Sequence, residues 1–262
     1  MTVKTSKSED MCLVNDVDLH IIIFSCTSNL RVLCTQVKDI FIDGTFKCCP
    51  KFFEQLYTIH GYSNGHFIPL VFALLVSKSE DTYRKFLQHV IDICSARNLT
   101  FKPAVVHVDL ESTVHNVFRQ MFPQTSTQCC RFHLGQSWWR KIQKTVLSTE
   151  YKDNESNIEK WLRSFFGLAF LDPSDVEDCF EDDIMKVLPE DPRCISFADY
   201  ILESYIVPDS RFPPTLCLHY RHSTQNAQLM ERSRSMHTTT NNFMQLITQY
   251  LFSAQNPTST SG

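Results

Sequence analysis

Residues 39–46 read DIFIDGTF and residues 104–109 read AVVHVD, and these two stretches decide the fold. Both are short apolar runs of the kind that forms a buried strand. The first contains Asp43 and the second ends at Asp109. An ionised carboxylate in a buried strand is costly unless a cation or a hydrogen-bond donor meets it. The two aspartates are therefore the first candidates for a functional site.

The neighbouring runs predict an α/β domain followed by an all-helical second half. Residues 52–60 and 66–76 are apolar and joined to the first strand by short turns, so we expect an antiparallel meander. Further short β-rich runs are expected at 20–26, 31–37 and 128–134. Apolar residues at helix spacing predict helices over 81–97, with Asp81 or Thr82 as N-cap, and over 111–122, 135–147, 157–171 and 195–206.

The composition excludes several classes of protein. The 262 residues are 43% hydrophobic and 21% charged, which is typical of a globular chain. No apolar run reaches the roughly 18 residues that span a bilayer, and the N-terminus lacks the pattern of a signal peptide. We therefore expect an intracellular protein whose 11 cysteines do not form disulfides. The six glycines form no GxGxxG, P-loop or GxSxG motif, which removes the main support for nucleotide-binding and α/β-hydrolase folds.

The formal net charge of −4 argues weakly against nucleic-acid binding, but the charge is unevenly spread. Residues 172–191 hold nine of the 29 acidic residues and one of the 25 basic residues. The remaining chain therefore has 24 basic residues against 20 acidic ones. The predicted core is mildly basic, which weakens the objection to DNA as a partner.

Asp43 and Asp109 allow two interpretations. Aspartates from neighbouring strands can converge on one point, and an oxygen-rich site of that kind holds Mg²⁺. Two such ions can drive in-line phosphoryl transfer. Alternatively, Asp109 is the N-cap of the helix that follows it, which is a common role for an aspartate at the end of a strand. The pattern alone leaves both interpretations open.

A second candidate segment starts at Cys130 and His133, a thiol and an imidazole three residues apart. This spacing can serve zinc, but no second ligand pair accompanies it, so we do not expect zinc there. The pair is otherwise a buried structural pair, or His133 supports a phosphate or a carboxylate. The nearby aromatic and cationic residues suit a nucleic-acid backbone with stacked bases or, equally, an ordinary amphipathic helix: Arg131, Trp138, Trp139, Arg140, Lys141 and Lys144.

The order of these motifs resembles the catalytic domain of Mutator-like element (MULE) transposases, in particular the animal members joined to a FLYWCH-type zinc finger. The resemblance is carried by DGTF at 43–46, CCPKFFEQLYTIHGYSNGHFIPLVFALLVSKSEDTYRKFLQHV, VVHVDLESTVHNVFRQMFP and CCRFHLGQSWWRKIQ. It is dense over residues 20–147 and thin from there to residue 245.

This resemblance implies a ribonuclease-H-like fold, a mixed sheet flanked by helices with a helical insertion. It also implies a DDE-type enzyme that holds Mg²⁺ or Mn²⁺ with two aspartates and a glutamate and cuts and joins DNA strands. Asp43 and Asp109 match the aspartates, and Cys130 and His133 match the Cys-x-x-His motif. The expected division is 1–19 as linker or disordered segment, 20–150 as core, 151–236 as helical insertion, and 237–262 as core remnant with a disordered tail.

The chain departs from the family at the expected glutamate. After Thr240 and two asparagines, Gln245 stands where the glutamate is expected, with Met244 there under a one-residue shift. Glu203 and Glu231 are the other candidates. An amide lacks the charge that a metal pair requires, although its carbonyl oxygen can still ligate. This departure and the abrupt ends of the chain lead us to expect a fragment, or a decayed or co-opted copy.

Three functions remain open at this point. The first is an Mg²⁺-dependent transposase acting on the terminal inverted repeats of an element. The second is a catalytically dead, transposase-derived protein that binds DNA or regulates. Ribonuclease activity on RNA–DNA hybrids follows from fold analogy alone. For the first two we expect a nuclear protein with DNA as partner, able to form a homo-oligomer, and with no membrane and no small-molecule substrate.

Overall fold

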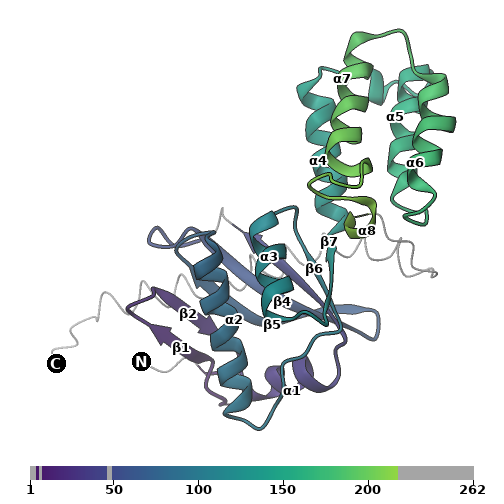
Figure 1. The fold of residues 1–262 in the computed structure, drawn as a ribbon. Coiled ribbons are helices and arrows are strands. Elements are labelled where there is room, and N and C mark those ends of the chain that lie inside the picture. Colours follow the sequence, from purple (N-terminus) through teal and green to yellow (C-terminus); the bar gives the residue numbers. More distant parts are fainter. Residues whose placement is uncertain (1–3, 6–7, 46–48, 218–262) are drawn as a thin grey trace. The chain divides into compact units, whose positions relative to one another are not determined.

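The computed structural model of the chain describes residues 4–5, 8–45 and 49–217 (Figure 1). These residues fall into two compact units, divided between residues 126 and 127. The first unit contains a mixed sheet with helices, and the second is helical. Within the described part of the chain, no helix combines the length and the apolar character needed to cross a bilayer.

A seven-stranded mixed sheet forms the framework of the first unit. Neighbouring strands from β1 to β3 are antiparallel, whereas β3 and β6 are parallel. The expected meander is confirmed as β3, β4 and β5. Across the sheet the order is β1 (Cys12–Asp16), β2 (Ile21–Phe24), β5 (His66–Leu75), β4 (Gln55–Ser63), β3 (Asp39–Thr45), β6 (Val105–Val108) and β7 (Ser126–Cys129).

A two-residue turn fixes the register of the β4–β5 hairpin. Ser63 pairs with His66, so Asn64 and Gly65 form the turn, with φ of 51° and 80°. Positive φ at both central positions is what a type I′ turn requires, and Asn-Gly adopts it at little cost. The turn therefore sets the register of β4 and β5 from Ser63 back to His60, and the register shifts by one residue between His60 and Ile59.

Two helices cover one face of the sheet and build the larger core (Figure 1). They are α2 (Glu80–Ser95) and α3 (Ser112–Met121), and both follow the predicted helix spacing. Alternate residues of the strands point into this core, including Ile42 of β3 and Val108 of β6. The residues between them along each strand therefore point to the opposite face of the sheet.

One predicted strand is wrong. Residues 31–37 lie largely in the helix α1 (Thr27–Thr35). Leu30 and Leu33 are three residues apart, and both are buried in the core. Helix spacing thus outweighs the β-branched content of this short segment.

Two predicted element boundaries also differ. The N-cap of α2 is Ser79, whose Oγ accepts the Thr82 N–H, and not Asp81 or Thr82. The strand expected over 128–134 instead ends at Cys129, the last residue of β7. The next helix starts at Arg131.

The second unit is built from helices around an aromatic core. The helices expected over 157–171 and 195–206 are confirmed. Phe165 packs edge-to-face against Trp161 and Phe197, with ring centroids 4.8 and 5.0 Å away, a favoured aromatic geometry. The elements are α4 (Arg131–Lys144), η1 (Glu150–Lys152), α5 (Asn157–Leu168), α6 (Val176–Asp178), η2 (Cys179–Ile184), η3 (Met185–Val187), α7 (Pro192–Ile201), η4 (Leu202–Ile206) and α8 (Pro214–Cys217).

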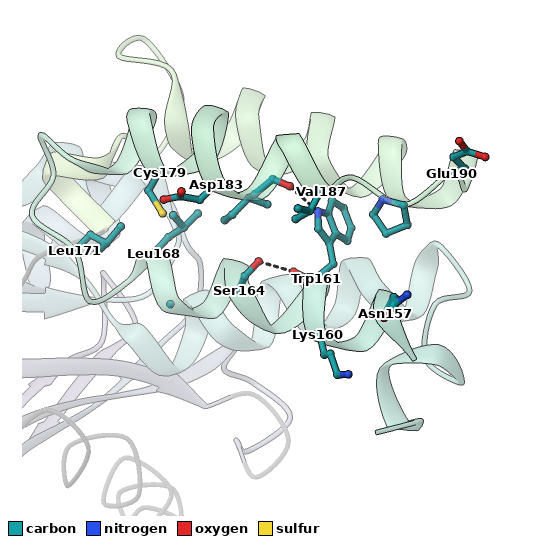
Figure 2. A pocket seen from close by; sticks show the side chains of 13 residues that line it. Asn157, Lys160, Trp161, Ser164, Leu168, Leu171, Cys179, Asp183, Val187 and Glu190 are labelled. Carbon is teal, nitrogen blue, oxygen red and sulfur yellow. Dashed lines mark hydrogen bonds between the residues drawn. The ribbon is translucent and has the colours of Figure 1, made fainter. Parts of the chain in front are cut away.

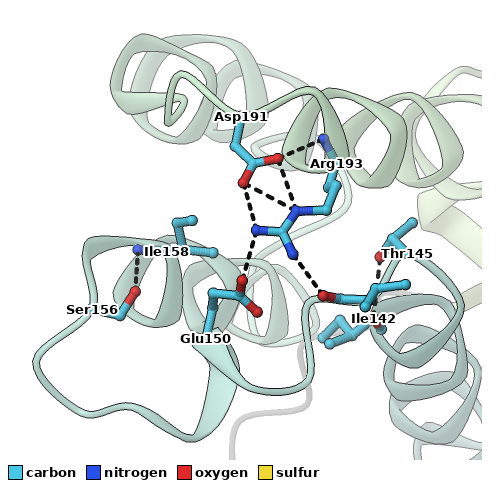
Figure 3. A network of polar contacts seen from close by, with 8 residues as sticks. Ile142, Thr145, Glu150, Ser156, Ile158, Asp191 and Arg193 are labelled. Atoms are coloured by element: carbon cyan, nitrogen blue, oxygen red, sulfur yellow. Dashed lines mark hydrogen bonds and ion pairs between the residues drawn. The ribbon is translucent and has the colours of Figure 1, made fainter.

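One arginine ties three segments of the helical unit together (Figure 3). The Arg193 guanidinium donates to Glu150 at 2.6 Å, to Asp191 at 2.8 Å and to the Val146 carbonyl at 2.8 Å. Asp191 also caps α7 by accepting the Arg193 N–H. The side-chain hydrogen bond from Arg193 holds the pKa of Asp191 below its usual value. The network fixes the start of α7 against the segment that follows α4.

A disulfide joins Cys129 to Cys217, contrary to the expectation that the cysteines do not form disulfides. The end of β7 and the end of α8 bring the two Cα atoms within 4.8 Å, a separation that a disulfide can bridge. The two cysteines are 88 positions apart in the sequence, so no local signal predicted their pairing.

Gly61 supplies a test of the packing on β4. A Cβ at this position would lie 2.6 Å from Val37 and 2.8 Å from Leu70, too close for carbon atoms. We predict that Gly61→Ala lowers the free energy of unfolding of the sheet unit by about 1–3 kcal/mol. Hydrogen exchange of the β4 amides measures the change.

The matched control is Gly167 in α5, where a Cβ meets nothing within 4 Å. Gly167→Ala should stabilise its helix by about 0.5–1 kcal/mol because alanine has the higher helix propensity. Equal protection of β4 in the wild type and in Gly61→Ala would contradict the prediction.

Candidate functional site

Asp43 and Asp109 lie at the same level of two adjacent parallel strands. In the pairing of β3 with β6, Phe41 faces His107, and their rings stack with centroids 4.2 Å apart. Continuing this register by two residues places Asp109, the residue after β6, opposite Asp43. Neighbouring strands lie about 4.8 Å apart. The parallel pairing alone therefore brings the two carboxylates together.

The Asp43 carboxylate is expected on the face of the sheet opposite α2 and α3. Side chains alternate along a strand, and Ile42 and Val108 point into the core beneath those helices. Asp43 follows Ile42 within β3, so it points the other way, whereas Asp109 lies just beyond the end of β6. Asp43 is buried, with 2% of its surface exposed. The site is thus a carboxylate pair toward the C-terminal ends of two parallel strands.

The alternative interpretation of Asp109 as an N-cap is wrong. Helix α3 starts at Ser112, and its N-cap residue is Glu111. The main chain of Asp109 instead meets His115, whose Nε2 lies 2.9 Å from the Asp109 carbonyl oxygen. A carbonyl oxygen only accepts, so Nε2 carries the proton. Burial lowers the pKa of His115 to about 4, and the ring is therefore neutral at pH 7.

Burial and neighbouring carboxylates raise the pKa of Asp109 to about 7. Burial has the largest effect, followed by repulsion from Glu111 and then from Asp43. Lys78 and a backbone hydrogen bond from Glu111 act in the opposite direction. A carboxylate that holds its proton this firmly lies where negative charge is already concentrated. Such a position favours the arrival of a cation.

A third carboxylate, Glu111, belongs to this cluster and was not among the predicted site residues. Its Oε1 accepts the Tyr83 hydroxyl at 3.1 Å, and Gln55 Nε2 donates to the Tyr83 oxygen at 3.0 Å. The Lys78 ammonium lies 3.7 Å from the other carboxylate oxygen. These contacts hold Glu111 beside Asp109. Its only signal in the sequence is its place two residues after Asp109.

The residues fit a divalent cation held through two carboxylates. Mg²⁺ is commonly bound by one or two carboxylates, with water or substrate phosphate completing its shell. Asp43 and Asp109 supply this pair. The pKa of Asp109 is raised first by burial and then by repulsion from Glu111 and Asp43, and a bound cation would relieve that repulsion. Among the described residues, no group of three or more His, Cys, Asp or Glu side chains is arranged to hold a metal ion.

The stretch that contains this cluster matches a known domain. Residues 40–137 match the MULE transposase domain. The match includes Asp43, Asp109 and Glu111, and it ends before the cations at 140–144. The resemblance drawn from the order of the motifs is confirmed at the level of this domain. No match was found among curated proteins.

The Cys-x-x-His motif of the MULE match lies at the start of α4. Cys130 is the N-cap residue of this helix, and His133 lies in its first turn. Arg131, between them, is half-buried and has its guanidinium 4.4 Å from the centroid of the Phe170 ring. Burial lowers the pKa of Arg131. This arginine therefore packs within the helical unit as well as carrying charge.

The other predicted DNA contacts differ in exposure. Arg140 and Lys144 lie one helical turn apart on α4 and are exposed. Lys141 instead places its ammonium 5.1 Å from the centroid of the Tyr200 ring. Trp138 is buried, which fits the amphipathic-helix interpretation of this segment. Of the four predicted cations, Arg140 and Lys144 are those with exposed side chains.

Within the described part of the chain, none of the candidates for the third acid is found at the carboxylate cluster. Gln245, Met244 and Glu231 lie outside the part of the chain that the structure describes. Glu203 is an exposed residue of η4 in the helical unit. The identity of the third acid stays a prediction.

Asp109→Asn should stabilise the protein at pH 8 by more than at pH 5. An aspartate with a folded pKa of about 7 and an unfolded pKa near 3.9 binds more protons in the folded state between these values. Stability therefore falls as the pH rises from about 4 to about 7. The asparagine removes that cost, which amounts to a few kcal/mol above pH 7 at about 1.4 kcal/mol per pKa unit.

Urea unfolding at pH 5 and pH 8 measures this effect. Glu54→Gln is the control, because Glu54 is an exposed carboxylate just before β4. A stability difference between Asp109→Asn and the wild type that does not change with pH would speak against the buried, repelled carboxylate.

Proposed function

We propose that this chain is the catalytic domain of a DDE-type DNA transposase of the animal, FLYWCH-associated MULE group. The proposal rests on the parallel pairing of β3 with β6, whose register, continued by two residues, brings Asp109 opposite Asp43 within the matched region. A carboxylate pair of this kind suits metal-dependent cutting and joining of DNA strands. Three features of the cluster support the proposal: it is buried, its carboxylates repel one another, and Glu111 adds a third carboxylate.

In this proposal Asp43 and Asp109 hold Mg²⁺ or Mn²⁺. When bound, such ions activate the attacking oxygen and stabilise the leaving oxygen of an in-line phosphoryl transfer. The chain itself contributes position: the parallel strands set the spacing of the carboxylates. Tyr83 and Lys78 hold Glu111 beside them, so that the cluster stays strongly negative.

The arrangement of the sheet supports a ribonuclease-H-like fold for this unit. The first aspartate lies in a strand of an antiparallel meander, and the second follows the neighbouring parallel strand. Two helices flank one face of the mixed sheet. The helices that follow along the chain correspond to the proposed helical insertion over 151–236 and, with α4, to the segment just before it.

The proposed partner is DNA, in the form of the terminal inverted repeats of an element, in the nucleus. Arg140 and Lys144 are exposed on successive turns of α4, a placement that suits two phosphate contacts. A homo-oligomer belongs to the proposal, because one assembly could then hold two DNA ends. Cys130 and His133 are proposed as the motif of the family and not as a zinc site.

The purified chain should nick or join DNA that carries terminal inverted repeats when Mg²⁺ or Mn²⁺ is added. Asp43→Asn should lower the rate by roughly a thousandfold or more, since several kcal/mol of charge stabilisation are lost. Gel analysis of labelled DNA measures the rate. Asp39→Asn, four residues earlier in the same strand, is the control and should keep the activity. Cleavage that survives Asp43→Asn would sink the proposal.

Metal binding can be measured without catalysis. Mn²⁺ should raise the melting temperature of the wild type at pH 8, because a ligand that binds the folded state stabilises it. Asp43→Asn and Asp109→Asn should each lose most of this shift. An equal shift in the wild type and in both variants would show that the ion binds elsewhere.

A second candidate function is a catalytically inactive, transposase-derived protein that binds DNA or regulates. It is favoured by Gln245, because a neutral amide stands where the family has a glutamate. Metal-dependent cleavage by the unmodified chain would exclude this function.

Gln245→Glu separates the two functions. If the missing charge is the only defect, the substitution should raise strand cleavage at least tenfold over the unmodified chain in the same assay. Gln245→Asn, which changes length without adding charge, is the control. Equal cleavage by the glutamate and asparagine variants would place the third acid at another position.

A further inference from the structure

The helical unit contains an open groove that the proposed catalysis does not use (Figure 2). Its volume is about 770 Å³. One wall is the face of α5 that carries Trp161 and Leu168, and the other is formed by η2 and η3, with Ile184 and Val187. Val187 is 66% exposed, an unusual fraction for a valine beside a groove. Trp161, Leu168 and Ile184 are nearly buried and form the apolar base of the groove, whereas Val187 stands exposed at its edge.

The groove is open because one wall carries small residues. Ser164 and Gly167 line it between the larger side chains of α5, and a Cβ at Gly167 would meet nothing within 4 Å. The walls are held apart at a fixed spacing. The Trp161 indole N–H donates to the Ile184 carbonyl at 3.0 Å, where η2 passes into η3. This hydrogen bond joins the two walls and leaves the space between them clear.

The charge along the groove is strongly one-sided. Asp183 and Glu190 line the wall on the η2–η3 side and are exposed. They belong to residues 172–191, which hold nine acids and one lysine, and Lys186 of that segment is paired with Asp182. Lys160 is the basic residue that lines the α5 side. The lining is net negative and lies in an acidic segment, which favours a cationic occupant over a phosphate backbone.

We propose that this groove binds a basic amphipathic helix of a partner protein. An apolar groove between two helical walls matches the apolar face of such a helix, and the acidic rim matches its cations. The twelve residues of α5 give a wall about 18 Å long, enough for roughly three turns of a helix. This binding activity is independent of Asp43 and Asp109, and it does not rest on the transposase assignment.

The test uses a fluorescein-labelled 18-residue peptide of leucine and lysine in amphipathic helix order. Fluorescence anisotropy at physiological ionic strength measures its binding to the full chain. A peptide of leucine and glutamate in the same order should bind at least tenfold more weakly. A leucine–lysine peptide of alternating order, which forms no amphipathic helix, should also bind at least tenfold more weakly. Equal binding of either control peptide would overturn the proposal.

Two variants locate the site. Gly167→Phe fills the groove and should weaken binding of the first peptide at least tenfold, whereas Gly167→Ala, which adds a single methyl group, should leave it within about threefold. Circular dichroism confirms that each variant keeps its helices. Unchanged binding by Gly167→Phe would rule out this groove as the site.

Two double variants with the same change in charge test whether the acids at the rim of the groove bind the peptide, rather than the overall negative charge of the helical unit. Asp183→Lys with Glu190→Lys should weaken binding at least tenfold. Asp199→Lys with Glu203→Lys makes the same charge change at exposed acids that do not line the groove, and should leave binding nearly unchanged. An equal loss in both double variants would show non-specific attraction and contradict the proposal. Sedimentation in which Gly167→Phe dissociates a dimer, with no peptide bound by the wild type, would assign the groove to a second copy of the chain instead.

Discussion

The parallel pairing of β3 with β6 brings the carboxylates of Asp43 and Asp109 close together. Their repulsion destabilises the sheet unit, and other contacts have to offset it. Opposite positions in a parallel pair bring two carboxylates within one patch, and burial strengthens their mutual effect. The core under α2 and α3 keeps both strands in register despite this cost. Glu111 adds a further negative charge, and Tyr83 holds it there. A protein selected for stability alone would gain by losing these charges, which is why the cluster indicates a function.

The helical unit carries exposed charges of both signs. Arg140 and Lys144 make one exposed part of α4 basic, whereas Asp183 and Glu190 make the rim of the groove acidic. A phosphate backbone and a cationic helix are opposite partners, so one unit can distinguish them by charge alone. The net charge of the chain hides this difference, since the acidic segment outweighs the basic one.

The strands and the site residues Asp43 and Asp109 could be predicted because short apolar runs in the sequence mark them. Apolar runs predicted β3 to β6 and the short turns that join the first three of these strands. Features that depend on distant contacts could not. The register that opposes Asp43 and Asp109, the place of Glu111 beside them and the groove on α5 each arise from segments that meet only in the fold. The capping interpretation of Asp109 failed for the same reason, because the sequence does not show that α3 starts only at Ser112.

The disulfide between Cys129 and Cys217 has a consequence for how such a chain can evolve. The segment that leaves the sheet at β7 returns, 88 residues later, to within 4.8 Å of its starting point. A segment whose two ends meet can be added to or removed from a host fold without spreading the flanking residues. The two ends of the 129–217 segment therefore lie side by side, so the helices between them can change in length or sequence without moving either cysteine.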